Sequence, residues 1–581
     1  MKRRLLPMMM TLVLVCALPI WAAFVTSGDV TNPLVCTAWA DTAEGERNSG
    51  TTQETFTEVT DETTLKKAVA DGKSVRMTQD ITLTSSLCIE KAVTLDMDGH
   101  VLTRMHTYEY DMVVIRSDAT LTLIDSNTGN LQHRFNAGET GWTKAADNAT
   151  GDGIVTVTGG VIYGDAGRSI INPCGIKILK GKLEMYGGSI VGIRNVYNAN
   201  GGGVYVSDQC TFNMYGGSIK GCYVFSDGGG VYVAENGTFT MSGSSTIDNC
   251  KASSGGAVYN AGTFTMGGSS RIKDCTYYYG NTSGGVHNKG TFTVEGGSIT
   301  GSMNDGSSGD DISNENKLDV SEGITISCNV KVGYGGTISK GTFTGRVWNS
   351  EGTILGGTFT NEVINYEGTI KAGEFTGEVT NTYGGTISGG TFDKNVVNSA
   401  YNAIISNGSF HGTVTNESGA TISGGTFDEN VTNKTYATLN GGIFYGGVTN
   451  DGGTIGDGAY ETVTFNSDNG AQAKEEKVLR GQKVAKPTDD PTKSGYTFTG
   501  WEDANGAGAY DFNTPVTAPL TLTAKWEKNP SSGGYYYYPT TDTKTTDTKG
   551  SPKTADPGVA LYAALSILSL TGMVALNGKK R

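Results

Sequence analysis

Apolar and polar residues alternate in short runs that recur with a fixed period between Gly201 and Ile299. The run Val204-Tyr205-Val206 returns with its valine at Val231, Val258 and Val286, after 27, 27 and 28 residues. Each run is bounded by Gly, Ser or Asn, and alternation with period two is typical of strands rather than helices. A repeat of this length indicates a stacked architecture.

A second pattern keeps step with the first. A Thr-Phe pair recurs once per repeat and is followed by a Gly/Ser turn and an isoleucine, giving the series Phe212, Phe239, Phe264, Phe292 and Ile219, Ile247, Ile272, Ile299. One such unit has half of a hydrophobic face and buries it only against its neighbours. We therefore predict an all-β fold in which each repeat is one coil of a parallel β-solenoid, with Val204 and its equivalents pointing inward.

Cysteines occupy one position of this repeat. The third residue after the coil isoleucine is Cys222, Cys250 and Cys275 in successive units. Neighbouring coils at about 4.8 Å lie within disulfide reach, so a disulfide between coils is one interpretation. The favoured one is a column of buried thiols, because free cysteine behaves as a small apolar core residue.

After Tyr334 the repeat shortens to a phenylalanine every 16 to 18 residues, from Phe343 to Phe444. Three short strands fit such a unit, which predicts a second, narrower solenoid over 334–459. A Val-x-Asn follows each phenylalanine, so that asparagine recurs as Asn349, Asn365, Asn381, Asn398, Asn416, Asn433 and Asn450. This column is either a row of ligand contacts or a structural ladder, and the ladder is favoured because stacked amides hydrogen-bond along a solenoid.

The amino-terminal region has the features of an exported protein. Basic residues at 2–4 precede an apolar run from Leu5 to Val25, and an Ala-x-Ala ends at Ala40. This predicts a signal peptide over 1–40, and an uncleaved membrane anchor is the alternative. The Thr- and Glu-rich segment 41–61 is expected to be a loose leader. The next segment, 64–70, is expected to form a helix that covers the open edge of the first coil.

From residue 62 to 333 the chain resembles pectin-lyase-like right-handed β-helices. The residues that carry this resemblance are Asp80-Ile81-Thr82-Leu83 and the turn Leu95-Asp96-Met97-Asp98-Gly99-His100. It implies a fold and no particular activity.

The segment 460–527 resembles the Listeria-Bacteroides repeat, also called the internalin B-repeat. The matching phrases are Val463-Thr464-Phe465, Gly495 to Trp501, Tyr510-Asp511-Phe512 and Leu520 to Trp526. The resemblance implies a small β-grasp-like module on a bacterial surface protein. Its aromatic residues are expected to form a core rather than a ligand site: Phe465, Tyr496, Phe498, Trp501 and Trp526.

The carboxyl-terminal region combines a linker, 528–550, with a tripartite end, 551–581. Ser551-Pro552-Lys553-Thr554-Ala555 precedes an apolar run from Val559 to Leu576 and the basic tail Lys579-Lys580-Arg581. The run is about 27 Å long as a helix, close to the width of a bilayer core. This arrangement resembles the LPxTG-class sorting signal, and the resemblance implies that sortase cuts between Thr554 and Ala555 and joins Thr554 to peptidoglycan. A simple tail anchor is the alternative.

Composition and motifs argue against several functions. The net charge of −14 makes nucleic acid a poor partner, and motifs for P-loops, zinc proteases and EF-hands are absent from the sequence. We expect no enzyme activity, metal or cofactor. Asp248 and Asp274 fall near one column, but we expect no Lys or Arg to repeat beside them, as a polysaccharide-cleaving site on a solenoid flank would require.

A surface column is the better candidate. Alternation turns Tyr205, Tyr232, Tyr259 and His287 outward along one stripe, where rings could stack on sugars. Stacking between coils is the structural alternative. We therefore expect a protein of the Gram-positive cell wall or cell surface that displays a solenoid for adhesion to a host or bacterial glycan or matrix protein. The alternatives are an extracellular polysaccharide lyase or hydrolase and a passive spacer, and membrane contact is expected only through the terminal segments of the precursor.

Overall fold

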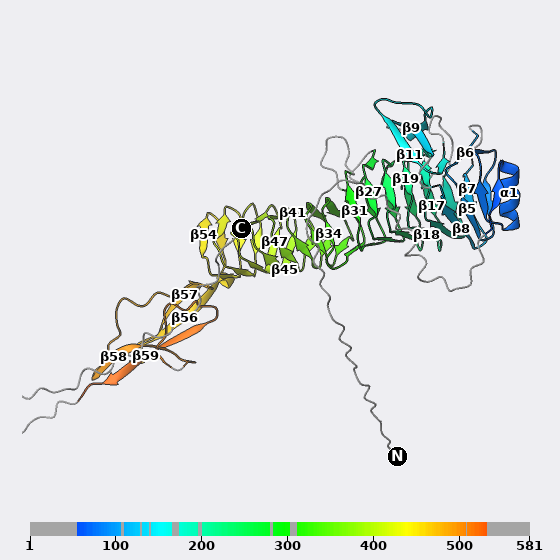
Figure 1. Cartoon of the computed structure of the whole chain (residues 1–581). Coiled ribbons are helices and arrows are strands. Elements are labelled where there is room, and N and C mark those ends of the chain that lie inside the picture. Colours follow the sequence, from blue (N-terminus) through cyan, green and yellow to red (C-terminus); the bar gives the residue numbers. More distant parts are fainter. Residues whose placement is uncertain are drawn as a thin grey trace, which may run out of the picture.

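The computed structural model places most of the chain between residues 55 and 530, and Figure 1 shows the order of its parts along a rod. The predicted signal peptide, most of the leader, most of the linker and the whole sorting signal lie outside the described residues. The described ranges are 55–105, 110–127, 131–138, 141–164, 174–195, 200–278, 283–301, 311–506 and 508–530.

Strands that begin with valine or another aliphatic residue form a 16-stranded parallel sheet, the valine sheet, along the rod. Val204 pairs with Val231, and Val258 pairs with both Val231 and Val286. All four side chains are fully buried. The predicted solenoid and the inward direction of its valines are therefore confirmed. The strands of this sheet are β4 (Leu87–Ile89), β7 (Val113–Ile115), β13 (Ile176–Ile178), β17 (Val204–Val206), β21 (Val231–Val233), β25 (Val258–Asn260), β29 (Val286–Asn288), β32 (Ile312–Asn314), β35 (Val330–Val332), β38 (Val347–Ser350), β41 (Val363–Tyr366), β44 (Val379–Thr382), β46 (Val396–Ser399), β48 (Val414–Asn416), β51 (Val431–Lys434) and β54 (Val448–Asp451).

A second sheet, the phenylalanine sheet, has 24 strands. Its middle strands stack Phe212, Phe239, Phe264 and Phe292 in register, with ring centroids 4.6–4.8 Å apart. The first part of this sheet, with one strand per coil, comprises β1 (Thr57–Val59), β2 (Val75–Met77), β5 (Val93–Asp96), β8 (Ala119–Ile124), β14 (Gly181–Met185), β18 (Thr211–Met214), β22 (Thr238–Met241), β26 (Thr263–Met266), β30 (Thr291–Val294) and β33 (Lys317–Val320).

Two further sheets close the wider coils. The isoleucine sheet stacks Ile219, Ile247, Ile272 and Ile299, and comprises β3 (Ile81–Leu83), β6 (Val101–Arg104), β12 (Val161–Tyr163), β15 (Ser189–Val191), β19 (Ser218–Lys220), β23 (Thr246–Asp248), β27 (Arg271–Lys273) and β31 (Ser298–Thr300). A short sheet of four strands follows it in each central coil: β16 (Arg194–Asn195), β20 (Tyr223–Val224), β24 (Lys251–Ala252) and β28 (Thr276–Tyr277). Cys222, Cys250 and Cys275 lie between these two sheets as free, fully buried thiols, which confirms the thiol column.

The helix α1 (Glu62–Asp71) lies at the start of the rod, as expected (Figure 1). Asp61 and Thr64 form a capping box at its first turn, and Gly72 ends it in the left-handed conformation (φ 79°). Leu65, Ala68 and Val69 are buried against the first strands. The strand β1 precedes the helix and pairs with β2, so the end of the expected loose leader already belongs to the sheet.

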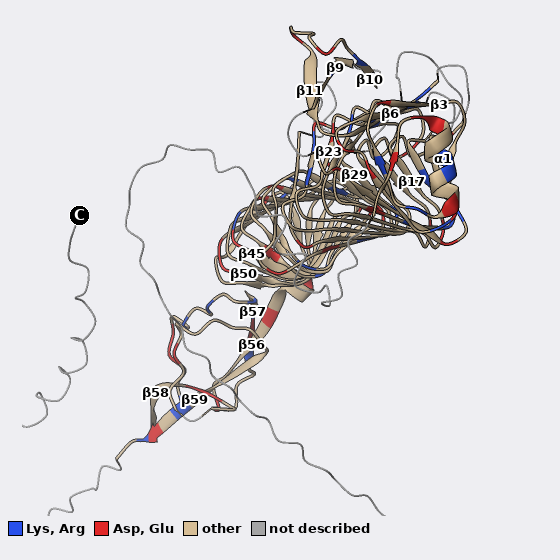
Figure 2. Cartoon of the chain, turned by 45° about the vertical axis from the view of Figure 1, so that its right-hand side comes forward, with Lys and Arg blue, Asp and Glu red and all other residues tan. Residues whose placement is uncertain are grey.

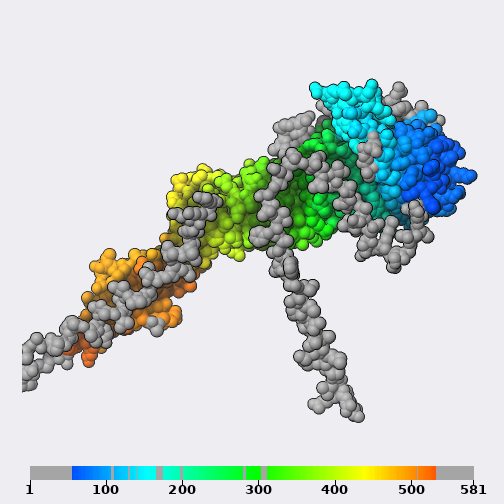
Figure 3. Space-filling view, in the orientation of Figure 1, coloured from blue at the N-terminus to red at the C-terminus, as the bar shows by residue number. Residues whose placement is uncertain are grey.

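The coil shortens at Ile312, which is followed at its equivalent position by Val330, 18 residues later. The change therefore comes one coil before residue 334, where the phenylalanine pattern predicted it. The phenylalanine pattern begins one coil too late because the first narrow coil has Ile326 where the later coils have phenylalanine. Ile326 pairs in register with Phe343. Figure 3 shows that the rod is thinner in this carboxyl-terminal part than in the preceding one.

In the narrow coils the phenylalanine sheet supplies two strands per turn, so each coil has the three predicted strands. The first row comprises β36 (Thr337–Ile338), β39 (Thr353–Ile354), β42 (Thr369–Ile370), β45 (Thr386–Phe392), β47 (Ile404–Phe410), β49 (Thr421–Ile422), β52 (Thr438–Leu439) and β55 (Thr454–Ile455). The second row comprises β34 (Thr325–Ile326), β37 (Thr342–Phe343), β40 (Thr358–Phe359), β43 (Glu374–Phe375), β50 (Thr426–Phe427) and β53 (Ile443–Phe444), and in two coils it is fused with the first.

The asparagine column of the narrow coils is a hydrogen-bonded ladder. From Asn349 to Asn450, each Nδ2 donates to the Oδ1 of the next asparagine at 2.6–2.9 Å. The ladder also has an upstream part, Asn260 to Asn314, which sequence reasoning missed. Val332 lies between the two parts. Beside the ladder, the rings from Phe343 to Phe444 stack with centroids 4.7–5.2 Å apart.

Two small sheets depart from the coil pattern. An antiparallel insert projects from the rod between β8 and β12 and comprises β9 (Gln132–Gly138), β10 (Gly141–Lys144) and β11 (Ile154–Thr158) (Figure 1). At the other end, β56 (Tyr460–Asn466), β57 (Lys474–Leu479), β58 (Tyr496–Asp503) and β59 (Leu520–Lys528) form a four-stranded sheet in the order β57-β56-β59-β58. Its central pair is parallel, and the outer pairs are antiparallel.

This terminal sheet is attached directly to the last coils. The backbone carbonyl of Arg480 accepts a hydrogen bond from the backbone N–H of Phe444 (2.8 Å). The backbone N–H of Arg480 donates to the carbonyl of Ala459 (3.0 Å), the last residue of the 3-10 turn Asp457–Ala459. Phe465 and Trp501 are buried in the core of the sheet, with Phe498 and Trp526 packed beside them. Tyr496 is 38% exposed, so its expected place in the core is wrong; it lies at the start of an edge strand, under Lys493. Among the described helices of the chain, none is long and apolar enough to cross a membrane.

Replacement of Asn381 by alanine tests the ladder. The change removes the donor to Asn398 Oδ1 and the acceptor for Asn365 Nδ2, both inside a fully buried column. We expect a local loss of about 1–3 kcal/mol, because buried partners stay unsatisfied, seen as a lower guanidinium midpoint and faster amide exchange in the neighbouring coils. The exposed Asn361→Ala should change stability by less than about 0.5 kcal/mol. Equal midpoints for the two variants would contradict a stabilising ladder.

Candidate functional site

The predicted aromatic column is present as a continuous stack on the valine sheet. The ring centroids of Tyr205, Tyr232, Tyr259 and His287 are 5.0–5.2 Å apart and the rings are nearly parallel. The tyrosines are half-buried, and Lys177 Nζ lies 5.4 Å from the centroid of the Tyr205 ring at one end. Burial raises the pKa of each tyrosine, and that of Tyr259 to about 12. The stack therefore presents neutral hydroxyl groups, and ligand contact there stays a prediction.

His287 differs from the tyrosines above it because it is 2% exposed. Its Nε2 lies 3.3 Å from Glu315 Oε1, with Lys289 and Lys331 nearby. Burial lowers the pKa of His287 to about 4, in spite of the attraction from Glu315. A neutral, buried imidazole continues the stack but offers little surface to a ligand.

The opposite flank of the wide coils has a repeated tight turn between the isoleucine sheet and the short four-stranded sheet. Gly221, Asn249 and Asp274 occupy its left-handed position in successive coils, with φ of 53–58°. Gly and, less often, Asn or Asp are the residues that tolerate this conformation. The buried cysteine comes next in each coil, and burial raises the pKa of Cys222 and Cys275, so these sulfurs are protonated core groups.

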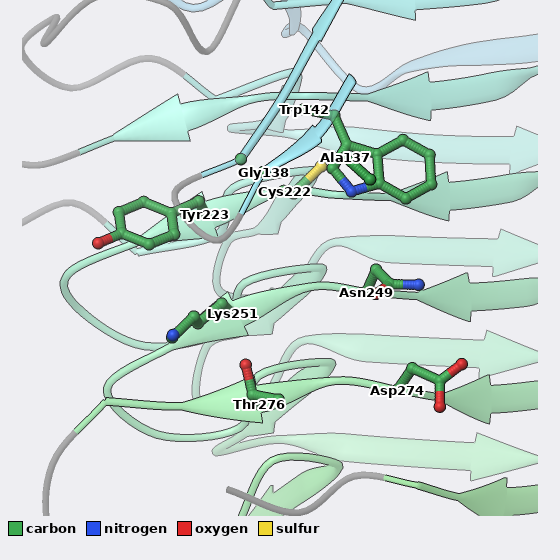
Figure 4. Close-up of a pocket in the computed structure, with 10 residues that line it drawn as sticks. Ala137, Gly138, Trp142, Cys222, Tyr223, Asn249, Lys251, Asp274 and Thr276 are labelled. Atoms are coloured by element: carbon green, nitrogen blue, oxygen red, sulfur yellow. The ribbon is translucent and has the colours of Figure 1, made fainter. Parts of the chain in front are cut away.

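The insert covers part of this flank and forms one side of a half-open pocket of about 250 Å³ (Figure 4). Its hairpin supplies Trp142, whose backbone N–H donates to the carbonyl of Gly221 at 3.3 Å, together with the backbone around Gly138 and Gly141. Three successive coils supply the floor and far wall. In Figure 4 the side chains of Tyr223, Lys251 and Thr276 follow one another down one column, and Asn249 and Asp274 follow one another down the next.

The charges beside the pocket alternate in sign. Lys220 and Lys273 lie 3.8 and 3.4 Å from Asp248, and Lys273 is also 3.6 Å from Asp274. The expectation that no basic residue repeats beside these carboxylates is therefore wrong: Lys220, Asp248 and Lys273 are in-register neighbours, where opposite charges are favoured. The lysine within the pocket, Lys251, lies 4.8 Å from the centroid of the Tyr278 ring.

The pocket can hold a small polar ligand and shows no built metal centre. It offers an ammonium, a carboxylate, an amide and a hydroxyl around one half-open hollow, a mixture that suits hydroxylated or zwitterionic molecules. Within the described ranges of the chain, no group of three or more His, Cys, Asp or Glu side chains is arranged to hold a metal ion. Sequence reasoning missed this site because the insert has no repeat pattern.

The predicted sorting motif, Ser551 to Ala555, lies outside the described residues, so the structure does not place it.

Comparison with known proteins identifies one part of the chain. Residues 462–525 match the family model of the Listeria-Bacteroides repeat domain, and these residues form nearly all of the terminal four-stranded sheet. No curated protein matches the chain, and no solved structure matches it. The repeat domain is typical of extracellular surface proteins, so the terminal sheet and the β-solenoid together fit a surface protein.

The burial of His287 predicts an acid-dependent loss of stability. The unfolded chain protonates this imidazole near pH 6.5 and the folded chain only near pH 4. Its contribution is therefore complete above pH 6.5, falls by about 3 kcal/mol as the pH drops to 4, and stays lost below. His287→Phe should keep the stack and remove this component of the pH dependence of the unfolding midpoint. The exposed His411→Gln should retain it; an unchanged pH profile in the His287 variant would refute the assignment.

Proposed function

We propose that the chain is a wall-anchored surface protein of a Gram-positive bacterium, which displays its β-solenoid for adhesion to a glycan or protein. The observation that carries this proposal is the direct joining of a long solenoid to a Listeria-Bacteroides repeat domain. With 16 strands in the valine sheet, the solenoid is about 70 Å long. A rod of this length holds a binding surface well away from the layer to which its end is fixed.

The ends of the sequence support the same proposal. The basic and apolar run before residue 40 suits export, and the segment 551–581 suits arrest in the membrane with Pro552 to Thr554 outside. A sortase would then cut after Thr554 and link it to peptidoglycan. For the wide coils we propose the pectin-lyase-like cross-section, since separate valine, phenylalanine and isoleucine sheets enclose one core there.

Polysaccharide cleavage is the second candidate function, and the flank pocket is the observation that favours it. Glycoside hydrolysis generally needs two carboxyl groups facing one bond. Of the two carboxylates on this flank, Asp248 is buried between two lysines and Asp274 alone lines the pocket. We therefore favour binding over lyase or hydrolase activity. A passive spacer role is the third possibility.

Binding by the purified chain is the first test of this proposal. Residues 41–550 should bind at least one component of an array of host glycans, matrix proteins and bacterial polysaccharides, because the solenoid exposes aromatic and polar turns along its length. If the terminal module bound the ligand without the solenoid, adhesion would belong to that module, and its assignment to the solenoid would be wrong. Release of unsaturated products or reducing ends from a polysaccharide would support the enzyme instead, and no binding at all would leave the spacer.

Wall attachment is tested separately in the cells that produce the protein. Thr554→Ala should abolish covalent attachment, because the acyl group that sortase transfers belongs to Thr554 in the proposed reaction. The variant should remain with the membrane fraction, whereas the wild-type chain should be released by muramidase digestion of the wall. Thr546→Ala, in the linker, should behave like wild type. Muramidase release of the Thr554 variant would exclude this anchor.

A further inference from the structure

A row of exposed tyrosines follows one corner of the narrow solenoid. This corner joins each strand of the valine sheet to the first strand row of the phenylalanine sheet. The side chains of Tyr334, Tyr383, Tyr401 and Tyr436 are 81%, 57%, 75% and 84% exposed. Tyr366 occupies the same corner and is half-buried, with its ring centroid 5.2 Å from that of Tyr383. We call these five residues the tyrosine ridge.

Folding does not account for tyrosine at these positions. Two of the five, Tyr383 and Tyr436, have φ of 47° and 68°, in the left-handed region that favours Gly or Asn. Other coils have Gly452 at this corner, or the smaller or more polar residues Glu351, Glu367 and Ser418 in the same conformation. A bulky residue in this conformation costs about 1 kcal/mol or more, and a ring that is mostly exposed regains little of this by burial. Residues that are strained and exposed are candidates for contact with another molecule.

The ridge contrasts with the predicted column at Tyr205. There the rings stack on one another in register and are half-buried, so they stabilise the sheet whether or not a ligand binds. On the ridge, Tyr334 and Tyr436 are each two coils from the next tyrosine of the ridge. Their faces are open to solvent.

The spacing of the ridge suits a linear partner that runs along the rod. Its tyrosines are one or two coils apart, about 5 or 10 Å. Each tyrosine lies two or three residues before the start of a first-row strand. The outward position of those strands is threonine in most coils, including Thr337, Thr369, Thr386 and Thr438. Rings and half-exposed hydroxyl groups therefore run in parallel. An extended chain with apolar faces and many hydroxyl groups would match both rows.

Charge narrows the chemistry of that partner. Glu351 and Glu367 are exposed at the same corner, and Glu417 is paired there with Lys434 at 2.7 Å. Figure 2 shows acidic and basic residues interspersed along the narrow coils, without a concentrated basic surface on the face in view. A polyanion would meet repulsion from the carboxylates of Glu351 and Glu367. A neutral polymer would meet none.

We infer that the tyrosine ridge binds a neutral polysaccharide strand, whose sugar rings stack on the tyrosines while its hydroxyl groups bond to the neighbouring threonines. The inference rests on the proposed adhesive function and gives it a ligand class and a surface. Aromatic rings bind sugars because they combine a rigid apolar face with a polar edge. Several weak contacts repeated along the rod together give a stable attachment.

The test measures binding of residues 41–550 to mannan, dextran and hydroxyethyl cellulose by affinity electrophoresis, with hyaluronan as the anionic comparison. The ridge variant replaces Tyr334, Tyr383, Tyr401 and Tyr436 by asparagine, which tolerates the left-handed turn and preserves the fold. The control variant replaces Tyr186 and Tyr445, which lie outside the ridge and are 45% and 47% exposed, by asparagine. We expect at least a tenfold loss of neutral-glycan binding in the ridge variant, less than a twofold change in the control, and unchanged circular dichroism in both.

Three results would overturn the inference. They are equal glycan binding by the ridge and wild-type chains, stronger binding of hyaluronan than of the neutral polymers, and no neutral-glycan binding by the wild type. If in the last case a matrix protein binds and the ridge variant loses it, adhesion stands and the ligand class is wrong. If neither glycans nor proteins bind the wild-type chain, the proposed adhesion fails together with the inference.

Discussion

In-register stacking of each coil on the next determines which side chains this protein can use. A parallel rung places every residue beside its equivalent in the neighbouring coil, so a column works only when its members attract one another. Valine and phenylalanine satisfy this by apolar contact, and asparagine does so because an amide is both donor and acceptor. Charged residues do not repeat in the same way: the column Lys220, Asp248, Lys273 alternates in sign.

This constraint separates the scaffold from the sites. Residues in strands belong to columns whose members bind one another, and most of their side chains contact other residues of the rod. Turns are free of that demand, because their residues face solvent and need only suit the local backbone. Both surfaces with open chemistry lie at turns and at the strand ends beside them: the pocket at the corner of Asn249 and Asp274, and the tyrosine ridge. The proposed function thus depends on residues that differ from coil to coil, at turns where the repeat constrains the side chain least.

The periodic part of the fold was predictable from sequence for the same reason. Val204 and Phe212 recur because each apolar side chain in these columns packs against the same residue type in the next coil. The buried thiols and the amide ladder were predicted because Cys and Asn also recur at one fixed position of the repeat. Apart from the upstream part of the ladder, Asn260 to Asn314, what escaped prediction is aperiodic. The insert at 132–158 has no repeat, Ile326 disguises the first narrow coil, and the burial of His287 and exposure of Tyr496 depend on neighbours that are distant in sequence. The lysines beside Asp248 were missed because the charge in this column alternates in sign from coil to coil, so that lysine does not recur in successive coils.

The gap at Val332 in the amide ladder has a consequence for how the chain finds its structure. Neighbouring narrow coils are near copies, so a strand misplaced by one coil would recover most of the correct contacts and could persist as a trap. Val332 lies between Asn314 and Asn349 and leaves Asn349 Oδ1 without a hydrogen-bond partner. A slip by one coil would place Val332 opposite Asn365 instead, and would break an amide bond that the correct stack makes. The irregular rungs therefore act as landmarks that distinguish one level of the stack from the next, and a more perfectly repetitive sequence would assemble less faithfully.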